Sequence, residues 1–148
     1  MPYWKQNILW NKKIKSKVQS SPIDKDEARA WTWFSRYIRL RDCLSAGSRE
    51  VFKCCSCSCL THFSKWDAWH FISRSYTSTK FDERNVYAQC QKCNRFQQGC
   101  WDKMYEHVLK LHGQSVIDEL LRKKNEIVKY IDYSSIGDYY KNLFNSMK

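Results

Sequence analysis

Two short cysteine motifs decide the fold of this chain: Cys54-Cys55-Ser56-Cys57 and Cys90-Gln91-Lys92-Cys93-Asn94. In each motif two cysteines stand three positions apart, a spacing at which a tight turn directs both sulfurs toward one centre. Four thiolates arranged in this way bind one tetrahedral zinc ion, which fixes a small segment rich in loops. The sequence therefore predicts a structural zinc site made by Cys54, Cys57, Cys90 and Cys93.

The first motif leaves its register open. Cys55, Cys59 and His62 are alternative ligands, and Cys55 with Cys59 is the competing pair. Cys43 and Cys100 are interpreted as buried thiols outside the zinc site, because free cysteine is among the most buried residue types.

The charge balance indicates a polyanionic partner. The 148 residues include 26 Lys and Arg against 15 Asp and Glu, a net charge of +11. Such an excess in a small protein favours nucleic-acid binding, although a basic surface can also serve solubility alone. Hydrophobic residues make up 43% and aromatic residues 16%, which excludes disorder throughout the chain.

Cysteine usage and the N-terminal sequence bear on the compartment. Eight cysteines also suit a secreted disulfide scaffold. However, residues 1–5 lack the apolar core and the cleavage site of a signal peptide, and no apolar run approaches the ~20 residues of a transmembrane helix. We therefore expect a cytoplasmic protein without membrane contact, whose cysteines bind metal.

The chain is interpreted as three parts: a basic arm at residues 1–23, a core with a preceding helix at 24–113, and a helical extension at 114–148. The arm carries five lysines and no acidic residue, so it is either a phosphate-binding arm or a solvated terminus. Helices are predicted at 24–44 with Asp24 as the cap, from 94 to the stop at Gly113, at 115–130 and at 136–147, with a loop at 132–135. Two strands are predicted within 65–73 and 85–89, joined by a polar stretch.

Three residues between and after the cysteine motifs carry a second chemistry. A neutral imidazole at His70 can take a proton from water, although a lone strand histidine is more often packed in a core. The amide of Asn85 can tie the loop that carries His70. The Asn94 oxygen follows a zinc ligand, and one such oxygen with several waters suits Mg²⁺. We expect the zinc scaffold to set His70 and Asn94 across from each other at one phosphodiester.

These motifs resemble the HNH, or ββα-metal, nuclease motif, in particular zinc-stapled members such as endonuclease VII-type junction resolvases. Four segments more closely resemble the phage NinG (Rap) recombination endonucleases: Tyr37–Asp42, Ala68–Arg74, Phe81–Val86 and Gln89–Asn94. The similarity covers roughly residues 33–130.

The resemblance implies an α+β fold with a zinc-stapled ββα-metal (HNH, His-Me finger) core. It also implies hydrolysis of phosphodiester bonds in branched DNA, such as Holliday junctions and D-loops, to 5′-phosphate and 3′-OH ends in a phage-infected bacterial cell. Carried over by position, His70 is the general base, Asn85 the asparagine that orients it, and Asn94 a ligand of a catalytic Mg²⁺ or Mn²⁺ ion.

The chain departs from the motif at the residue before the histidine. Many HNH enzymes place a carboxylate there and NinG-like chains tend to have glycine, whereas this chain has Trp69. The nearest carboxylate, Asp67, lies about 6.6 Å along the same face of a regular strand, so it serves as a ligand only if the strand bends or water intervenes. Gln98, one turn after Asn94, is a weak ligand, and we expect the ion to bind loosely.

Basic residues around the motif are the candidate phosphate contacts: Arg74, Lys80, Arg84, Lys92 and Arg95. Arginines of the 24–44 helix are either solvated or DNA-facing, and the aromatics Trp66, Trp69, Phe71 and Phe81 are expected in the core. Two symmetric cuts require a homodimer, expected through the terminal helices. The alternative is a zinc-ribbon nucleic-acid-binding protein without catalysis.

Overall fold

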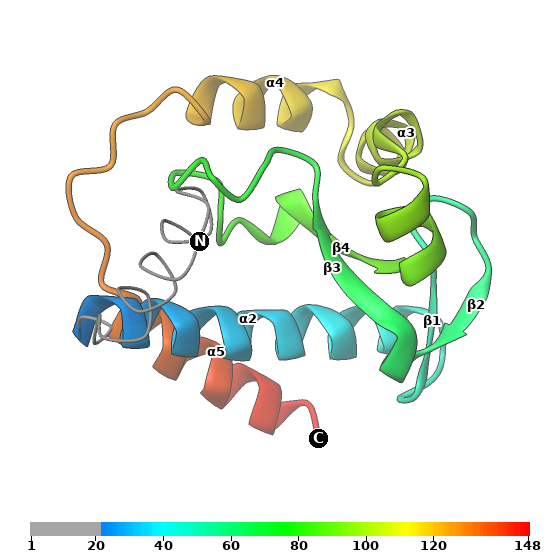
Figure 1. Ribbon diagram of the computed structural model, residues 1–148, viewed down its shortest axis with the longest axis horizontal. Coiled ribbons are helices and arrows are strands. Elements are labelled where there is room, and N and C mark those ends of the chain that lie inside the picture. The colour runs from blue at the N-terminus through cyan, green and yellow to red at the C-terminus, as the bar shows by residue number, and fades with distance from the viewer. Residues whose placement is uncertain (1–21) are drawn as a thin grey trace, which may run out of the picture.

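The computed structural model of the chain describes residues 22–148 (Figure 1). The predicted basic arm therefore lies, up to residue 21, outside the described residues. The fold is mixed α+β. Two small antiparallel sheets are surrounded by the helices α2, η3, α3, α4 and α5. Among the residues that the structure describes, no helix combines the length and the hydropathy that crossing a bilayer requires.

The long helix α2 spans Pro22–Ser45. Proline suits the first turn of a helix, because its missing N–H would have no intrahelical partner there. The helix thus begins two residues before the predicted start, and Asp24 lies inside it and is not its cap. Phe34 and Ile38, four positions apart, are fully buried on the face that meets the strands.

The two predicted strands are confirmed. β3 spans Trp66–His70 and β4 spans Val86–Cys90, and they pair antiparallel from Trp66 opposite Cys90 to His70 opposite Val86. A second hairpin, β1 (Val51–Lys53) with β2 (Leu60–His62), was not predicted. Short helical turns at η1 (Phe63–Lys65) and η2 (Glu83–Asn85) precede β3 and β4.

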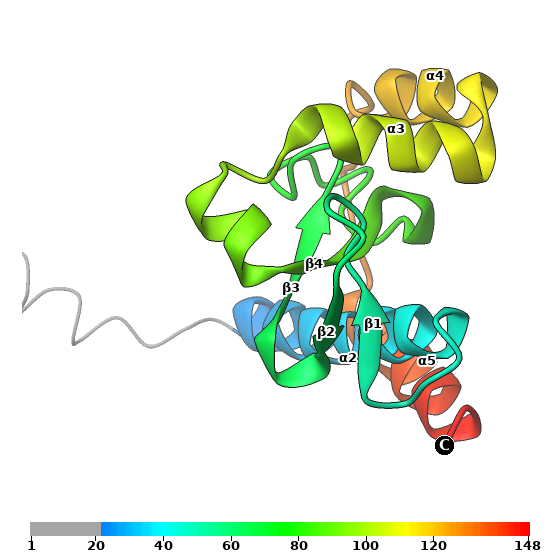
Figure 2. The ribbon, with the colours of Figure 1, turned by 90° about the vertical axis from the view of Figure 1, so that its right-hand side faces the viewer.

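The β3–β4 hairpin lies between α2 with α5 on one side and α3 with α4 on the other (Figures 1 and 2). On the α2 side, Trp66, Ala68 and Val86 pack with Phe34 and Ile38. On the other side, Trp69 and Tyr87 pack against α3 and α4. Because side chains alternate along a strand, each face of the hairpin has its own core.

The helical predictions after residue 94 are right in kind but wrong in their bounds. A π-helix, η3 (Lys92–Phe96), is separated by residues 97–100 from α3 (Trp101–His112), which Gly113 ends as predicted. α4 spans Gln114–Lys123 and stops well before residue 130. The apolar residue Ile127 is 90% exposed, so the helical period continues there without a core to bury it.

The last helix, α5, spans Tyr133–Ser146 and packs along α2. Its cap is Asp132, whose carboxylate accepts a hydrogen bond from the Ser135 amide at 3.0 Å. The predicted loop at 132–135 is therefore the first turn of this helix.

Arg41 of α2 is neither solvated nor DNA-facing. Its guanidinium donates to the carbonyls of Glu83 and Val86 at 2.9 and 2.7 Å, and to the neighbouring Asp42. Asp42 in turn accepts from the Ala88 amide at 2.7 Å. This pair fixes β4 to α2 through the backbone, which positions the cysteine that ends β4.

Candidate metal centre and active site

The four predicted cysteines meet at one point. Cys54 follows β1, Cys57 lies in the turn before β2, Cys90 ends β4 and Cys93 lies in η3. Their sulfurs all lie within 4.8 Å of one another, and those of Cys57 and Cys90 are 3.8 Å apart. Zn–S bonds of ~2.3 Å give a tetrahedron with edges of about 3.8 Å, so the donor set fits zinc.

A bound cation would stabilise the ionised form of the four clustered thiols. A hydrogen bond from the Cys55 thiol lowers the pKa of Cys54 to about 4, against its burial. Burial and the neighbouring Cys90 thiol raise the pKa of Cys93 above its usual range. Thiolates so close together repel one another, and a divalent ion lets all four ionise.

The alternative ligands lie elsewhere. Cys55 is buried in the core between the hairpin and α3, and Cys59 is exposed. The ring of His62 bonds to the hydroxyl of Ser64 at 2.9 Å. Cys43 is buried as predicted, whereas Cys100 is only partly buried.

His70, the last residue of β3, is 7% exposed. Its ring stacks on Trp31 of α2 at 5.2 Å, and its Nε2 lies 3.0 Å from the Lys80 carbonyl. A carbonyl only accepts, so Nε2 carries the proton and Nδ1 is the basic nitrogen. Burial, with Arg74 and Lys80 adding to it, lowers the pKa of His70 to about 4. The imidazole is therefore neutral at pH 7.

Asn85 is fully buried behind His70. Its Oδ1 accepts from the Ile72 amide at 2.7 Å, and its Nδ2 donates to the carbonyls of Ile72 and Thr79, each at 3.0 Å. Its own carbonyl accepts from the Phe71 amide at 2.9 Å. These bonds hold the loop between β3 and β4 in one conformation, beginning at the residue after His70.

Asn94 contacts Asp67 across the other face of the hairpin. The Asn94 Nδ2 donates to Asp67 Oδ2 at 2.8 Å, although β3 is regular and Asp67 pairs in register with Gln89. No bend of the strand is needed to bring the two side chains together. Arg95 also binds this carboxylate, with Nε and Nη2 at 3.0 and 3.1 Å from its two oxygens.

The structure does not bring His70 beside Asn94. His70 faces α2, whereas Asp67, three positions earlier on β3, faces η3. An odd separation along a strand puts two side chains on opposite faces. The expectation that zinc sets His70 and Asn94 directly across from each other therefore differs from what is found.

The predicted phosphate contacts divide into paired and exposed residues. Arg84 is held by Asp82 and Glu119, and Lys80 by an ion pair with Glu27. The Arg74 guanidinium lies 5.8 Å from the Trp31 ring centre. Lys92 and Arg95 are exposed on η3, although Arg95 is also paired with Asp67. Asp82 is only two positions from Arg84, whereas Glu119 and Glu27 are distant in sequence from the residues they pair with, so no local pattern could have found those two pairs.

Trp31 is the residue near this site that sequence reasoning missed. It lies on α2, far from the cysteine motifs in sequence, and only the fold puts it over His70. Strand patterns give the faces of a hairpin but not the helix that covers each face.

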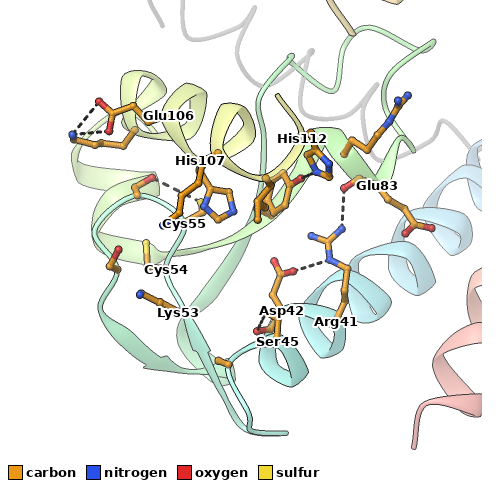
Figure 3. Close-up of a pocket in the computed structure, with 18 residues that line it drawn as sticks. Arg41, Asp42, Ser45, Lys53, Cys54, Cys55, Glu83, Glu106, His107 and His112 are labelled. Atoms are coloured by element: carbon orange, nitrogen blue, oxygen red, sulfur yellow. Dashed lines mark hydrogen bonds and ion pairs between the residues drawn. The ribbon is translucent and has the colours of Figure 1, made fainter. Parts of the chain in front are cut away.

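A cavity of about 670 Å³ opens between the end of α2, β1 and α3 (Figure 3). Inside it, the Tyr87 hydroxyl and His112 Nε2 are 2.5 Å apart, and burial lowers the pKa of His107 and of His112. Its charged residues have both signs, and Arg41 pairs with Asp42 within it. His70, Asp67 and Asn94 do not line this cavity.

The family model described as "NinG: Bacteriophage Lambda NinG protein" matches residues 5–148. Protein ninG of Escherichia phage 933W is 33% identical over 90 residues, which cover 60% of this chain and 41% of that protein. The phage lambda protein is 32% identical over 90 residues (60% and 40%), and that of Salmonella phage P22 is 32% identical over 85 residues (57% and 38%). The chain thus spans about two fifths of the length of these relatives, and no solved structure matches it.

Proposed function

The chain belongs to the NinG family of bacteriophage proteins, and from this premise we propose that it is a metal-dependent endonuclease that cuts branched DNA. The proposed substrates are recombination intermediates such as Holliday junctions and D-loops, cut to leave 5′-phosphate and 3′-OH ends. Because two symmetric cuts resolve a junction, the proposed active form is a homodimer.

The proposal rests mainly on one observation: the side-chain hydrogen bonds of Asn85 lock the loop after His70 in one conformation. A fully buried amide with three backbone hydrogen bonds holds this loop behind the ring. The Lys80 carbonyl, in the same loop, fixes the tautomer that leaves Nδ1 basic. A neutral imidazole of fixed tautomer is what a general base needs.

In the proposed reaction, Nδ1 of His70 accepts a proton from the attacking water. Because burial is the main cause of its low pKa, exposure of the ring to solvent would return the pKa toward its usual value and make the ring a stronger base. Trp31 therefore has to move when substrate binds.

Asp67 and Asn94 are the residues that would hold the catalytic ion, since a carboxylate and an amide oxygen suit Mg²⁺ or Mn²⁺. A bound divalent ion supplies charge stabilisation for the departing 3′ oxygen. To accommodate it, the Asn94 amide must turn its oxygen toward Asp67, and Arg95 must release the carboxylate. A freed Arg95 can contact a phosphate.

The opposite orientations of His70 and Asn94 constrain how substrate would lie. Within the described chain β3 pairs only with β4, so the other edge of β3 is unpaired. A phosphodiester that reaches both residues would cross this edge or the end of the hairpin.

A zinc-dependent nucleic-acid-binding module without catalysis is the second candidate. It is favoured by two specific contacts: Trp31 covers His70, and Arg95 neutralises Asp67. The cysteine cluster fits both candidates equally.

Cleavage of a labelled four-way DNA junction in Mg²⁺ or Mn²⁺ separates the candidates. The zinc-loaded protein is compared with His70→Gln and with His107→Gln, a control at a partly buried histidine that lines the separate cavity. We expect cutting by the wild type and the control, and loss of at least about a hundredfold in rate for His70→Gln. Binding is measured in parallel by fluorescence anisotropy.

Two outcomes would remove the nuclease proposal. Binding of the junction by wild type with no cutting of any DNA in either ion would leave the binding module. Equal cutting by wild type and His70→Gln would show that another residue is the base.

A further inference from the structure

We propose that Phe96 is a wedge that stacks on an unpaired or weakly paired DNA base. The inference rests on the proposed function only for its ligand, DNA, and not on cleavage. Residues 95–98 of the chain, here called the η3 tip, present this side chain.

Phe96 is 82% exposed, more than any other large aromatic side chain that the structure describes. The next, Tyr130 at 80%, has a hydroxyl that water can bond, whereas phenylalanine has none. Single exposed apolar residues are common on protein surfaces, so exposure alone assigns no role. The backbone around Phe96 supplies the second observation.

The η3 tip is held rigidly at both ends. On one side Cys93 lies in the four-cysteine cluster that could hold a metal ion. On the other, three successive residues, Gln98, Gly99 and Cys100, have positive φ angles of 50°, 81° and 47°. The Gly99 amide donates to the Cys93 carbonyl at 3.0 Å, which closes the tip.

This backbone is also fastened to the hairpin. Gln89 Nε2 of β4 donates to the Gly99 carbonyl at 2.7 Å, and the Trp69 ring lies against Gly99. Strained conformations and π-helical turns cluster at functional sites, because the surrounding structure must hold them. Phe96 is thus displayed from a fixed frame, and little ordering is needed when it binds a ligand.

The charge around Phe96 selects a polyanion. Lys92 and Arg95 lie on the same π-helix and are exposed, and no acidic residue occurs from position 84 to position 101. The acidic side chain bound to this helix is Asp67 of β3, which pairs with Arg95. Figure 2 shows this segment, between β4 and α3, standing out from the body of the molecule. An apolar ring flanked by cations on a projecting tip matches a base flanked by phosphates.

The position of the tip would place the stacked base next to the candidate ion site. Asn94 and Arg95, the two residues before Phe96, both contact Asp67. A phosphate bound near Asp67 would bring a base within reach of Phe96. Bases at a branch point stack less well than those in a duplex, so the wedge would favour branched DNA.

The test uses four-way junctions with 2-aminopurine beside the branch point, and a linear duplex with the same label. Zinc-loaded protein is titrated in Ca²⁺, with anisotropy as the measure of binding and 2-aminopurine emission as the measure of unstacking. Phe96→Ala is compared with wild type, with Phe96→Trp, and with Tyr130→Ala as the matched exposed aromatic.

We expect wild type, Phe96→Trp and Tyr130→Ala to raise the 2-aminopurine emission of the junction. Phe96→Ala should lose this rise and bind the junction roughly 10- to 100-fold more weakly, the loss of stacking on one base. Unchanged zinc content and circular dichroism would show that the variant is folded.

Junction binding and emission by Phe96→Ala equal to wild type would overturn the wedge and leave the nuclease proposal intact. Absence of DNA binding by wild type would overturn both. A loss confined to Phe96→Ala supports the wedge whether or not the protein cuts.

Discussion

Replacing Gly99 by alanine tests how the η3 tip is held. Gly99 has a φ of 81°, and a Cβ there would lie 2.0 Å from Cζ2 and 2.4 Å from Cε2 of Trp69. Both distances are shorter than any contact between carbon atoms in folded proteins, so either the ring or the tip must shift.

Two costs add in the Gly99→Ala variant. A left-handed backbone costs alanine about 1–2 kcal/mol relative to glycine. Overpacking against the indole costs typically about 1–3 kcal/mol more. The expected loss in the free energy of unfolding is therefore about 2–5 kcal/mol.

Urea denaturation followed by circular dichroism, with zinc held constant, measures this loss. Trp69→Ala removes the ring that clashes, so Gly99→Ala in that background should cost only the backbone part. The double-mutant cycle should give a coupling of about 1–3 kcal/mol. Gly47→Ala is the control, because its φ is 74° and no atom lies within 4 Å of its Cβ.

Equal costs for Gly99→Ala with and without the Trp69 ring would refute this reasoning. So would a cost no greater than that of Gly47→Ala. Either result would mean that Trp69 does not lie on Gly99 in solution.

Three further predictions concern the zinc cluster and the His70 loop. Metal analysis should find about one zinc per chain in wild type and Cys59→Ser but a sharp loss in Cys93→Ser, and equal zinc in all three would remove Cys93 from the ligand set. Asn85→Ala should lower the free energy of unfolding by about 3 kcal/mol or more in urea, because it leaves buried backbone groups of Ile72 and Thr79 unpaired; a loss under about 1 kcal/mol would contradict the lock. The pKa of His70 is 6.5 in the unfolded chain and about 4 in the folded chain, so the unfolded chain takes up the proton first as the pH falls. Stability is therefore lost as the pH falls through this window, by about 1 kcal/mol from pH 7 to 5.5. His70→Gln should lack this part of the loss in urea titrations at the two pH values, and parallel curves would refute the low pKa.

The cysteine cluster and the central hairpin were predictable because their signals are local. Two fixed spacings identify the four cysteines that meet, and short segments rich in aromatic and apolar residues mark β3 and β4. The register of the first cysteine motif was open in sequence, and the fold settles it by burying Cys55 in a different core.

What sequence could not give depends on contacts between distant residues. The bidentate pair of Arg95 with Asp67 joins η3 to β3, and no pattern within either segment indicates it. The end of α4 was misplaced because Ile127 keeps the helical period but finds no core. His70 and Asn94 were expected to face each other, since the motif gives their order along the chain but not the faces of the strand between them.

The packing of α5 on α2 has a consequence for how the protein is made. During synthesis all four clustered cysteines are available once Cys93 has left the ribosome, so a metal ion bound by them would organise this half early. The apolar side of α2, including Phe34, is covered fully only when α5 packs on it. In the folded chain the ring centres of Phe34 and Tyr140 of α5 are 4.8 Å apart. Bringing together helices so distant in sequence is slow, because a long loop must close first. Nascent chains should therefore pass through a stage in which one half is ordered and the apolar side of α2 is still exposed to solvent. In this stage the chain is most accessible to chaperones and proteases.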